Sequence, residues 1–151
     1  MFMNQNDLLK RDVEGIRAFL DEFDPPANGE PREVSIGPSG QTVSVRNFPL
    51  PDGLNPDYVD IALLLPDYPA RPPIGAYLLK RNNEALLRQL KRVFNVFDRG
   101  FHDAPTIPNY QWICVVYDQN RWRYNAANVA AGDNLRKFLI RFFNFCQSKG
   151  R

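Results

Sequence analysis

The sequence predicts an α+β fold in a single domain that spans residues 1–151. Three observations lead to this class. Apolar residues recur at helical spacing near both ends of the chain, short strand-like segments lie between them, and proline- and glycine-rich turns separate these segments. A chain of 151 residues is long enough to bury a hydrophobic core without disulfide support.

The first expected element is an amphipathic helix of about four turns. Asn6 or Asp7 can cap its start, and Asp24-Pro25-Pro26 ends it. Spacings of four and three residues place one apolar stripe on a single face of this helix: Leu9, Val13, Ile16, Leu20 and Phe23.

The middle of the chain predicts a four-stranded antiparallel meander. Residues 33–36 and 42–48 flank a Gly-Pro-Ser-Gly turn and are typical of a hairpin. Residues 58–65 end in an apolar run that indicates a central buried strand, and residues 76–79 provide a fourth strand. The expected sheet therefore joins strands that are consecutive in the sequence.

Two further helices are predicted after the sheet. An inserted amphipathic helix covers about residues 82–98, and a closing helix begins after an N-cap at Asp133. The closing helix has an apolar stripe that includes Cys146, which predicts a buried structural thiol at that position. The residues expected in the core are Leu63, Leu65, Trp112, Leu139 and Phe142.

Composition limits the function classes. The formal net charge is +2, with 19 basic residues against 17 acidic ones, which argues against a nucleic-acid partner. Two cysteines make no disulfide framework, and no Cys/His cluster has zinc spacing, so we expect neither a metal nor a cofactor. The absence of signal-length or membrane-length apolar runs predicts a cytoplasmic protein with reduced thiols and no membrane partner.

Four motifs occur in a characteristic order along the chain. Pro66 to Pro73 reads P-D-Y-P-A-R-P-P, Ile107 begins the tripeptide I-P-N, Cys114 lies five residues after Asn109, and Trp122 follows eight residues later. This order closely resembles the signature of ubiquitin-conjugating enzymes, over roughly residues 6–145. The resemblance implies the fold of that superfamily, with an active-site segment between the fourth strand and the closing helix.

The resemblance also implies an activity. Cys114 would accept a ubiquitin-like protein from an activating enzyme as a thioester and pass it to a lysine of a target protein. Asn109 matches the asparagine that supports the oxyanion or the loop in that family. Activation with ATP would occur on another protein, because no phosphate-binding loop is present here.

Several positions depart from the family pattern. Ile107 replaces the motif histidine, the stretch from Asn109 to Cys114 is short, Trp122 lacks a following Ser-Pro, and the helix at 82–98 is an insertion. With these departures, the chain resembles the divergent bacterial branch of the superfamily, which includes components of antiphage defence operons.

Other interpretations stay open at this stage. Cys114 can be a small buried apolar residue, and Asn109 a turn residue after proline. His102 can fold over the cysteine or be a solvated loop histidine, and Asp118 can tune an incoming lysine or be a solvated carboxylate. The alternative function is a catalytically inactive module that binds a ubiquitin-like protein or its activating enzyme. The basic residues indicate solvated helix faces first and a docking surface for an acidic partner second.

Overall fold

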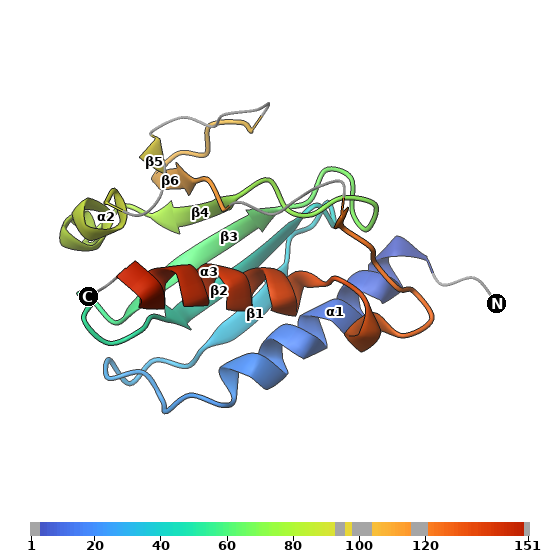
Figure 1. Ribbon diagram of the computed structural model, residues 1–151, viewed down its shortest axis with the longest axis horizontal. Coiled ribbons are helices and arrows are strands. Elements are labelled where there is room, and N and C mark those ends of the chain that lie inside the picture. The colour runs from blue at the N-terminus through green and yellow to red at the C-terminus, as the bar shows by residue number, and fades with distance from the viewer. Residues whose placement is uncertain (1–3, 93–95, 98–103, 116–120, 150–151) are drawn as a thin grey trace.

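The computed structural model describes residues 4–92, 96–97, 104–115 and 121–149 (Figure 1). Within these residues the chain forms an α+β structure in which helices cover one face of an antiparallel sheet. The N-terminal helix and the C-terminal helix of the prediction are both present. Their bounds are Gln5–Leu20 for α1 and Leu135–Lys149 for α3.

The sheet contains the predicted meander and extends beyond it. Its strands are β1 (Glu33–Ile36), β2 (Thr42–Pro49), β3 (Tyr58–Leu64), β4 (Ala76–Leu79), β5 (Val96–Phe97) and β6 (Tyr110–Ile113). In the described residues the strand order is β1-β2-β3-β4-β6-β5, and all neighbours pair antiparallel. The described sheet has two strands beyond the predicted four, because the segment that contains the I-P-N motif adds β6 to the edge of β4 and β5 pairs with β6.

Helices α1 and α3 lie side by side over the same face of the sheet (Figure 1). Alternation along β3 points Val59, Ile61 and Leu63 toward the helices, and each is at most 1% exposed. The aromatic rings of Phe19 and Phe143 join the two helices at a centroid distance of 6.2 Å. All five predicted core residues are buried, and Cys146 is fully buried on α3, as the sequence predicts.

The inserted helix is much shorter than the predicted one. Helix α2 spans Glu84–Leu90, and the later part of the predicted range contains β5, in which Phe97 pairs with Trp112. The buried residues of α2 are Leu86, Leu87 and Leu90. The helical spacing of apolar residues in the sequence therefore continues past the end of the helix. Residues 96–97 nevertheless form a strand, because their backbone pairs with β6.

Both long helices begin at a different cap from the predicted one. The side chain of Asn4 accepts from the backbone N–H of Asp7 at the start of α1. At α3, Asn134 Oδ1 accepts from the backbone N–H of Lys137 at 2.8 Å, whereas Asp133 accepts from the backbone N–H of Arg123. Asparagine and aspartate are equally good caps, so the sequence alone did not distinguish adjacent candidates.

The connection into α3 contains a short 3-10 helix, η2 (Val129–Ala131). On the sheet face opposite α1 and α3 lies a second, smaller apolar cluster, which we call the outer cluster. It consists of the buried residues Tyr77, Ala104 and Trp112, with partly buried residues packed against them. Tyr77 donates from its hydroxyl to the carbonyl of Pro105 at 2.7 Å, which fastens the segment before β6 to this face.

Candidate functional site

Cys114 directly follows β6 and is partly exposed. It lies two residues after Trp112, so both side chains are on the outer face of the sheet, away from α1 and α3. Cys114 packs against the outer cluster there. The thiol therefore lies at the end of a strand that is paired on both sides, with β4 and β5; one side of the thiol packs against apolar groups and another is open to solvent.

A glycine allows β6 to approach closely at this point. Gly75 has a φ of +60°, and a Cβ atom on it would lie 2.5 Å from both Ile113 O and Trp112 Nε1. Trp112 Nε1 donates to the carbonyl of Ile74 at 3.0 Å. Because a Cβ atom does not fit, the position next to Cys114 requires glycine.

The two thiols differ in burial and in acidity. Burial raises the pKa of the Cys114 thiol above its ordinary value of 9.0. Complete burial raises the pKa of Cys146 to about 12. Cys114 is thus the more accessible thiol and the one that ionises at lower pH, although it is a protonated thiol at neutral pH.

The proline-rich motif and the tryptophan after the cysteine are in contact. Trp122 Nε1 donates to the carbonyl of Pro69 at 2.9 Å, and the Trp122 side chain is 3% exposed. Tyr68 and Pro69 of the same motif are joined by a cis peptide bond. Two motifs 53 residues apart in the sequence therefore meet in one place, at the end of the sheet where the chain leaves β3.

A buried carboxylate ties this motif to both long helices. Asp12 on α1 is 1% exposed; its Oδ2 accepts from the hydroxyl of Tyr68 at 3.0 Å and its Oδ1 from the backbone N–H of Leu135 at 2.9 Å. The hydroxyl of Tyr68 is also hydrogen-bonded to that of Tyr124, at 3.1 Å. We call these four residues the Asp12 network. It joins α1, the proline-rich motif, the segment after Trp122 and the first turn of α3.

The electrostatics of the Asp12 network follow from its burial. Burial raises the pKa of Asp12 to about 6, although hydrogen bonds from Leu135 and Tyr68 oppose that rise. Burial, followed by the nearby Asp12, raises the pKa of Tyr68. Our sequence reasoning missed this network. The available signal was an aspartate at a stripe position of the first helix, between Leu9 and Ile16.

Asn109 does not lie beside Cys114. Strand β6 separates the two residues, and five residues of extended chain at about 3.3 Å each give a separation of ~16 Å. Asn109 has a φ of 70° and follows Pro108 in a turn closed by the hydrogen bond from Tyr110 N to Ile107 O. Asn109 therefore lies in a turn at the opposite end of β6 from the thiol, and its catalytic role stays a prediction.

The other candidates have varied positions. Ile107, at the place of the motif histidine, packs against the outer cluster and brings no polar group to it. His102 and Asp118 lie outside the described residues. Across the described part of the chain, no three His, Cys, Asp or Glu side chains are grouped so that they could hold a metal ion. No helix there combines the length and the apolar character needed to cross a membrane.

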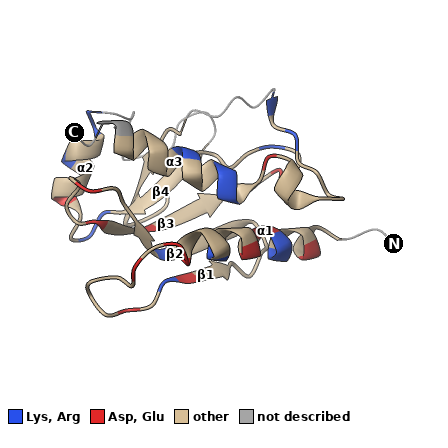
Figure 2. Cartoon of the chain, turned by 60° about the horizontal axis from the view of Figure 1, so that its bottom comes forward, with Lys and Arg blue, Asp and Glu red and all other residues tan. Residues whose placement is uncertain are grey.

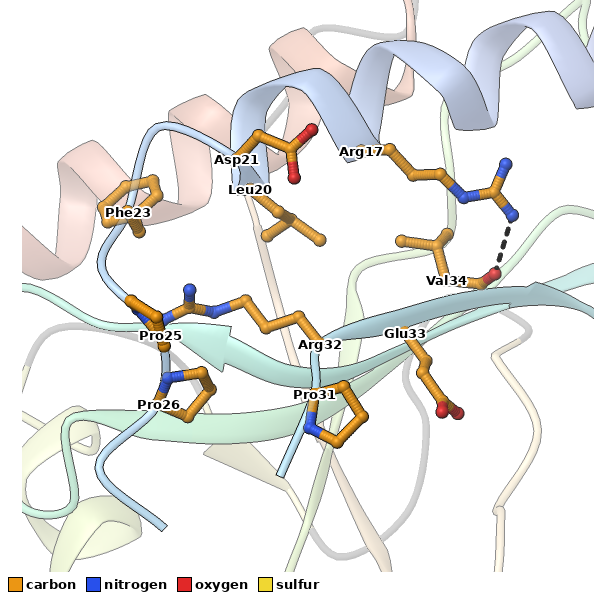
Figure 3. A pocket seen from close by; sticks show the side chains of 10 residues that line it. All are labelled: Arg17, Leu20, Asp21, Phe23, Pro25, Pro26, Pro31, Arg32, Glu33 and Val34. Carbon is orange, nitrogen blue, oxygen red and sulfur yellow. Dashed lines mark hydrogen bonds between the residues drawn. The ribbon is translucent and has the colours of Figure 1, made fainter. Parts of the chain in front are cut away.

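One pocket of about 540 Å³ lies far from the thiol, between the end of α1, the following loop and β1 (Figure 3). Arg17 Nη2 donates to the carbonyl of Val34 at 3.1 Å, and Arg32 donates to the carbonyls of Asp24 and Asn47. These arginines hold backbone at the β1 edge of the sheet, opposite the β6 side. The pocket thus has a structural explanation and contributes nothing to Cys114.

Comparison with protein-family models, with curated proteins and with solved structures finds no match to this chain.

Proposed function

We propose that this protein is a conjugating enzyme of the ubiquitin-conjugating fold, which carries a ubiquitin-like protein as a thioester on Cys114. The observation that carries the proposal is the position of Cys114. It is a partly exposed thiol at the end of β6, and it follows in sequence a proline-rich motif that contacts Trp122. The proposed chemistry comes from the sequence resemblance, and the contact between the proline-rich motif and Trp122 supports that resemblance.

The proposed reaction has two steps. The Cys114 thiolate attacks the thioester carbonyl that the activating enzyme presents, a new C–S bond forms, and the thiolate of the activating enzyme leaves. A lysine amine of the target then attacks the same carbonyl, a C–N bond forms, and the Cys114 thiolate leaves. The amine loses its proton to solvent or to a nearby base. No metal or cofactor takes part in either step.

The raised pKa of Cys114 is compatible with this chemistry. A thiolate of higher pKa is intrinsically more nucleophilic, and it is a poorer leaving group once acylated. Burial of the thiol thus favours a long-lived carrier at the expense of the fraction ionised at neutral pH. Since Asn109 is at the far end of β6, the oxyanion of the second step has to be stabilised by another group.

The alternative function is an inactive module of the same fold that binds a ubiquitin-like protein or its activating enzyme. Two observations favour it. The position of the motif histidine holds Ile107, and Asn109 lies ~16 Å from the thiol by the rise of an extended strand. In this case Cys114 is a packing residue of the outer cluster.

The experiment that separates these functions uses a peptide thioester ending in Gly-Gly, which needs no activating enzyme. The native protein should form an adduct that a reducing agent removes, as expected for a thioester on sulfur. Cys114→Ala should abolish the adduct, and Cys114→Ser should abolish it or leave a reductant-resistant oxyester, because a hydroxyl is a weaker nucleophile at neutral pH.

Cys146→Ala is the matched control, because that thiol is fully buried. The control variant should form the adduct to the same extent as the native protein. An adduct that persists in Cys114→Ala would contradict the proposal. Tight binding of a ubiquitin-like protein without any covalent adduct would favour the inactive module.

A further inference from the structure

A groove of about 590 Å³ lies at the opposite end of β6 from Cys114. Its walls are α2 and the segment that leads from β4 into that helix. The lining residues are Lys80, Arg81, Glu84, Leu87, Arg88, Lys91, Asn109 and Gln111. We call it the α2 groove.

The α2 groove is strongly positive. Four of its lining residues are lysine or arginine, and one is acidic, so it carries a formal charge of +3. The whole chain carries only +2. The remainder of the protein is therefore close to neutral. Figure 2 shows Lys and Arg on α1 and α3 as well, so it is the excess of basic over acidic residues that distinguishes the α2 groove.

Among the residues that the structure describes, three of these cations have no carboxylate partner. Arg81, Arg88 and Lys91 are exposed, and in the described part of the chain none of them lies within 4 Å of an acidic oxygen. Glu84 and Arg88 are one turn apart on α2 but form no ion pair. Like charges gathered without neutralisation repel one another, and an anionic ligand would relieve that repulsion.

The arrangement fits an extended acidic segment better than a small anion. Arg88 and Lys91 are separated by about 5 Å along the helix axis, and Arg81 reaches the groove from the chain before the helix. A single phosphate can contact only part of this set. Successive carboxylates of a peptide can contact each cation in turn, and arginine pairs with carboxylates in a bidentate manner.

The lining argues against nucleic acid. Single-stranded nucleic acid is held by aromatic rings that stack with bases, and none of the lining residues is aromatic. The lining also includes Leu87, which is 6% exposed, and the buried Gln111. An apolar side chain and an amide suit a peptide, which offers both aliphatic groups and backbone hydrogen-bonding groups.

We propose that the α2 groove binds an acidic peptide segment of a partner protein, one with at least two or three Asp or Glu residues in extended conformation. The groove contacts β6 at Gln111, and Cys114 follows the other end of that strand, so this docking site is distinct from the proposed thioester site. It does not depend on any reaction at Cys114.

The test measures fluorescence anisotropy of a labelled peptide of about eight residues in which Glu alternates with Ser. A peptide with Gln in place of Glu is the matched control. The acidic peptide should bind, and binding should weaken as salt is raised, because exposed charge contacts are screened. The Gln peptide should not bind measurably.

Variants locate the contact. Arg81→Gln combined with Arg88→Gln should weaken binding about tenfold or more, because two charge-assisted contacts are lost. Arg46→Gln on β2 removes an exposed cation outside the α2 groove and should leave the affinity unchanged. Glu84→Gln removes the one acidic group of the groove and should tighten binding. Circular dichroism of each variant checks that the fold is intact.

Four results would overturn the proposal. They are no binding of the acidic peptide, equal binding by the Arg81→Gln/Arg88→Gln variant, displacement of the peptide by millimolar inorganic phosphate, or tighter binding of a single-stranded RNA of the same charge. The third would make the groove a small-anion site. The fourth would make it a nucleic-acid surface.

Discussion

At the scale of single residues, Cys114 combines partial exposure with contact to the outer cluster. These two properties act in opposite directions on its reactivity. Exposure lets a reagent or a thioester reach the sulfur, whereas burial against apolar groups disfavours the charged thiolate and raises the pKa. Near neutral pH, the rate of any reaction at this thiol should therefore depend more strongly on pH than on access to the sulfur.

Alkylation of the native protein with iodoacetamide checks this directly. Cys114 should react faster than Cys146 at every pH, because Cys146 is fully buried and its pKa is raised to about 12. The rate at Cys114 should keep rising beyond pH 9, since its pKa is above the ordinary thiol value. Peptide mapping by mass spectrometry reports each site. Equal protection of both thiols would show that Cys114 is not available to a substrate.

Asn109 shows how a motif read from the sequence can be separated in the structure. The motif I-P-N was found from the sequence, but the spacing to Cys114 did not show that the intervening residues form a strand. Four of them pair with β4, which stretches the segment and sends the two ends apart. A motif therefore predicts a site only when the chain between its parts folds back, and backbone pairing with a distant strand is not visible in local sequence.

At the scale of elements, the sequence predicted the parts that depend on periodicity. The stripe of α1 and the alternation in β2 and β3 bury most of the expected residues, whereas Phe23 lies beyond the end of α1 and is only partly buried. What it did not predict depends on long-range pairing. Phe97 fits a helical stripe equally well, but it lies in β5 because its backbone pairs with Trp112.

The sequence did not predict the Asp12 network, which connects separate elements of the fold. Its hydrogen bonds hold α1, the proline-rich motif and the first turn of α3 together. The carboxylate also lies at the N-terminus of α3, where a negative charge is stabilised by the helix dipole. The motif around Tyr68 is thereby attached to both long helices of the domain.

The Asp12 network predicts a specific pH dependence. The pKa of Asp12 is raised from 3.8 to about 6, so the folded state binds more protons than the unfolded state between these values. Stability from this group is complete below about pH 4 and is lost as pH rises through 6, which amounts to roughly 3 kcal/mol. Asp12→Asn stays neutral and should lack this loss.

Urea unfolding at pH 4 and pH 7 measures the effect. The difference in free energy of unfolding between Asp12→Asn and the native protein should shift in favour of the variant as pH rises. Asp133→Asn is a suitable control, because Asp133 accepts a backbone hydrogen bond near the same helix but is only partly buried. A pH-independent difference for Asp12→Asn would contradict the prediction, because it would show that the pKa of Asp12 is the same in the folded and unfolded states.

At the scale of the whole molecule, the two proposed sites are at opposite ends of one short strand. The α2 groove includes Asn109 before β6, and Cys114 follows β6, with ~16 Å between them by the rise of an extended strand. A partner that docks an acidic segment in the groove would be held within reach of the thiol. Binding and acyl transfer can thus be separated by variants on different elements.

The most direct test of the proposed function follows the acylated protein after free lysine is added. Intact-mass spectrometry should show the Gly-Gly peptide leaving Cys114, an amide forming on lysine, and the unmodified protein mass returning, faster than the thioester hydrolyses without lysine. Cys146→Ala should behave in the same way, since that thiol takes no part. A native protein that never acquires the peptide mass, or that loses it no faster with lysine than without, would contradict the account of Cys114 as an acyl carrier that passes its load to an amine.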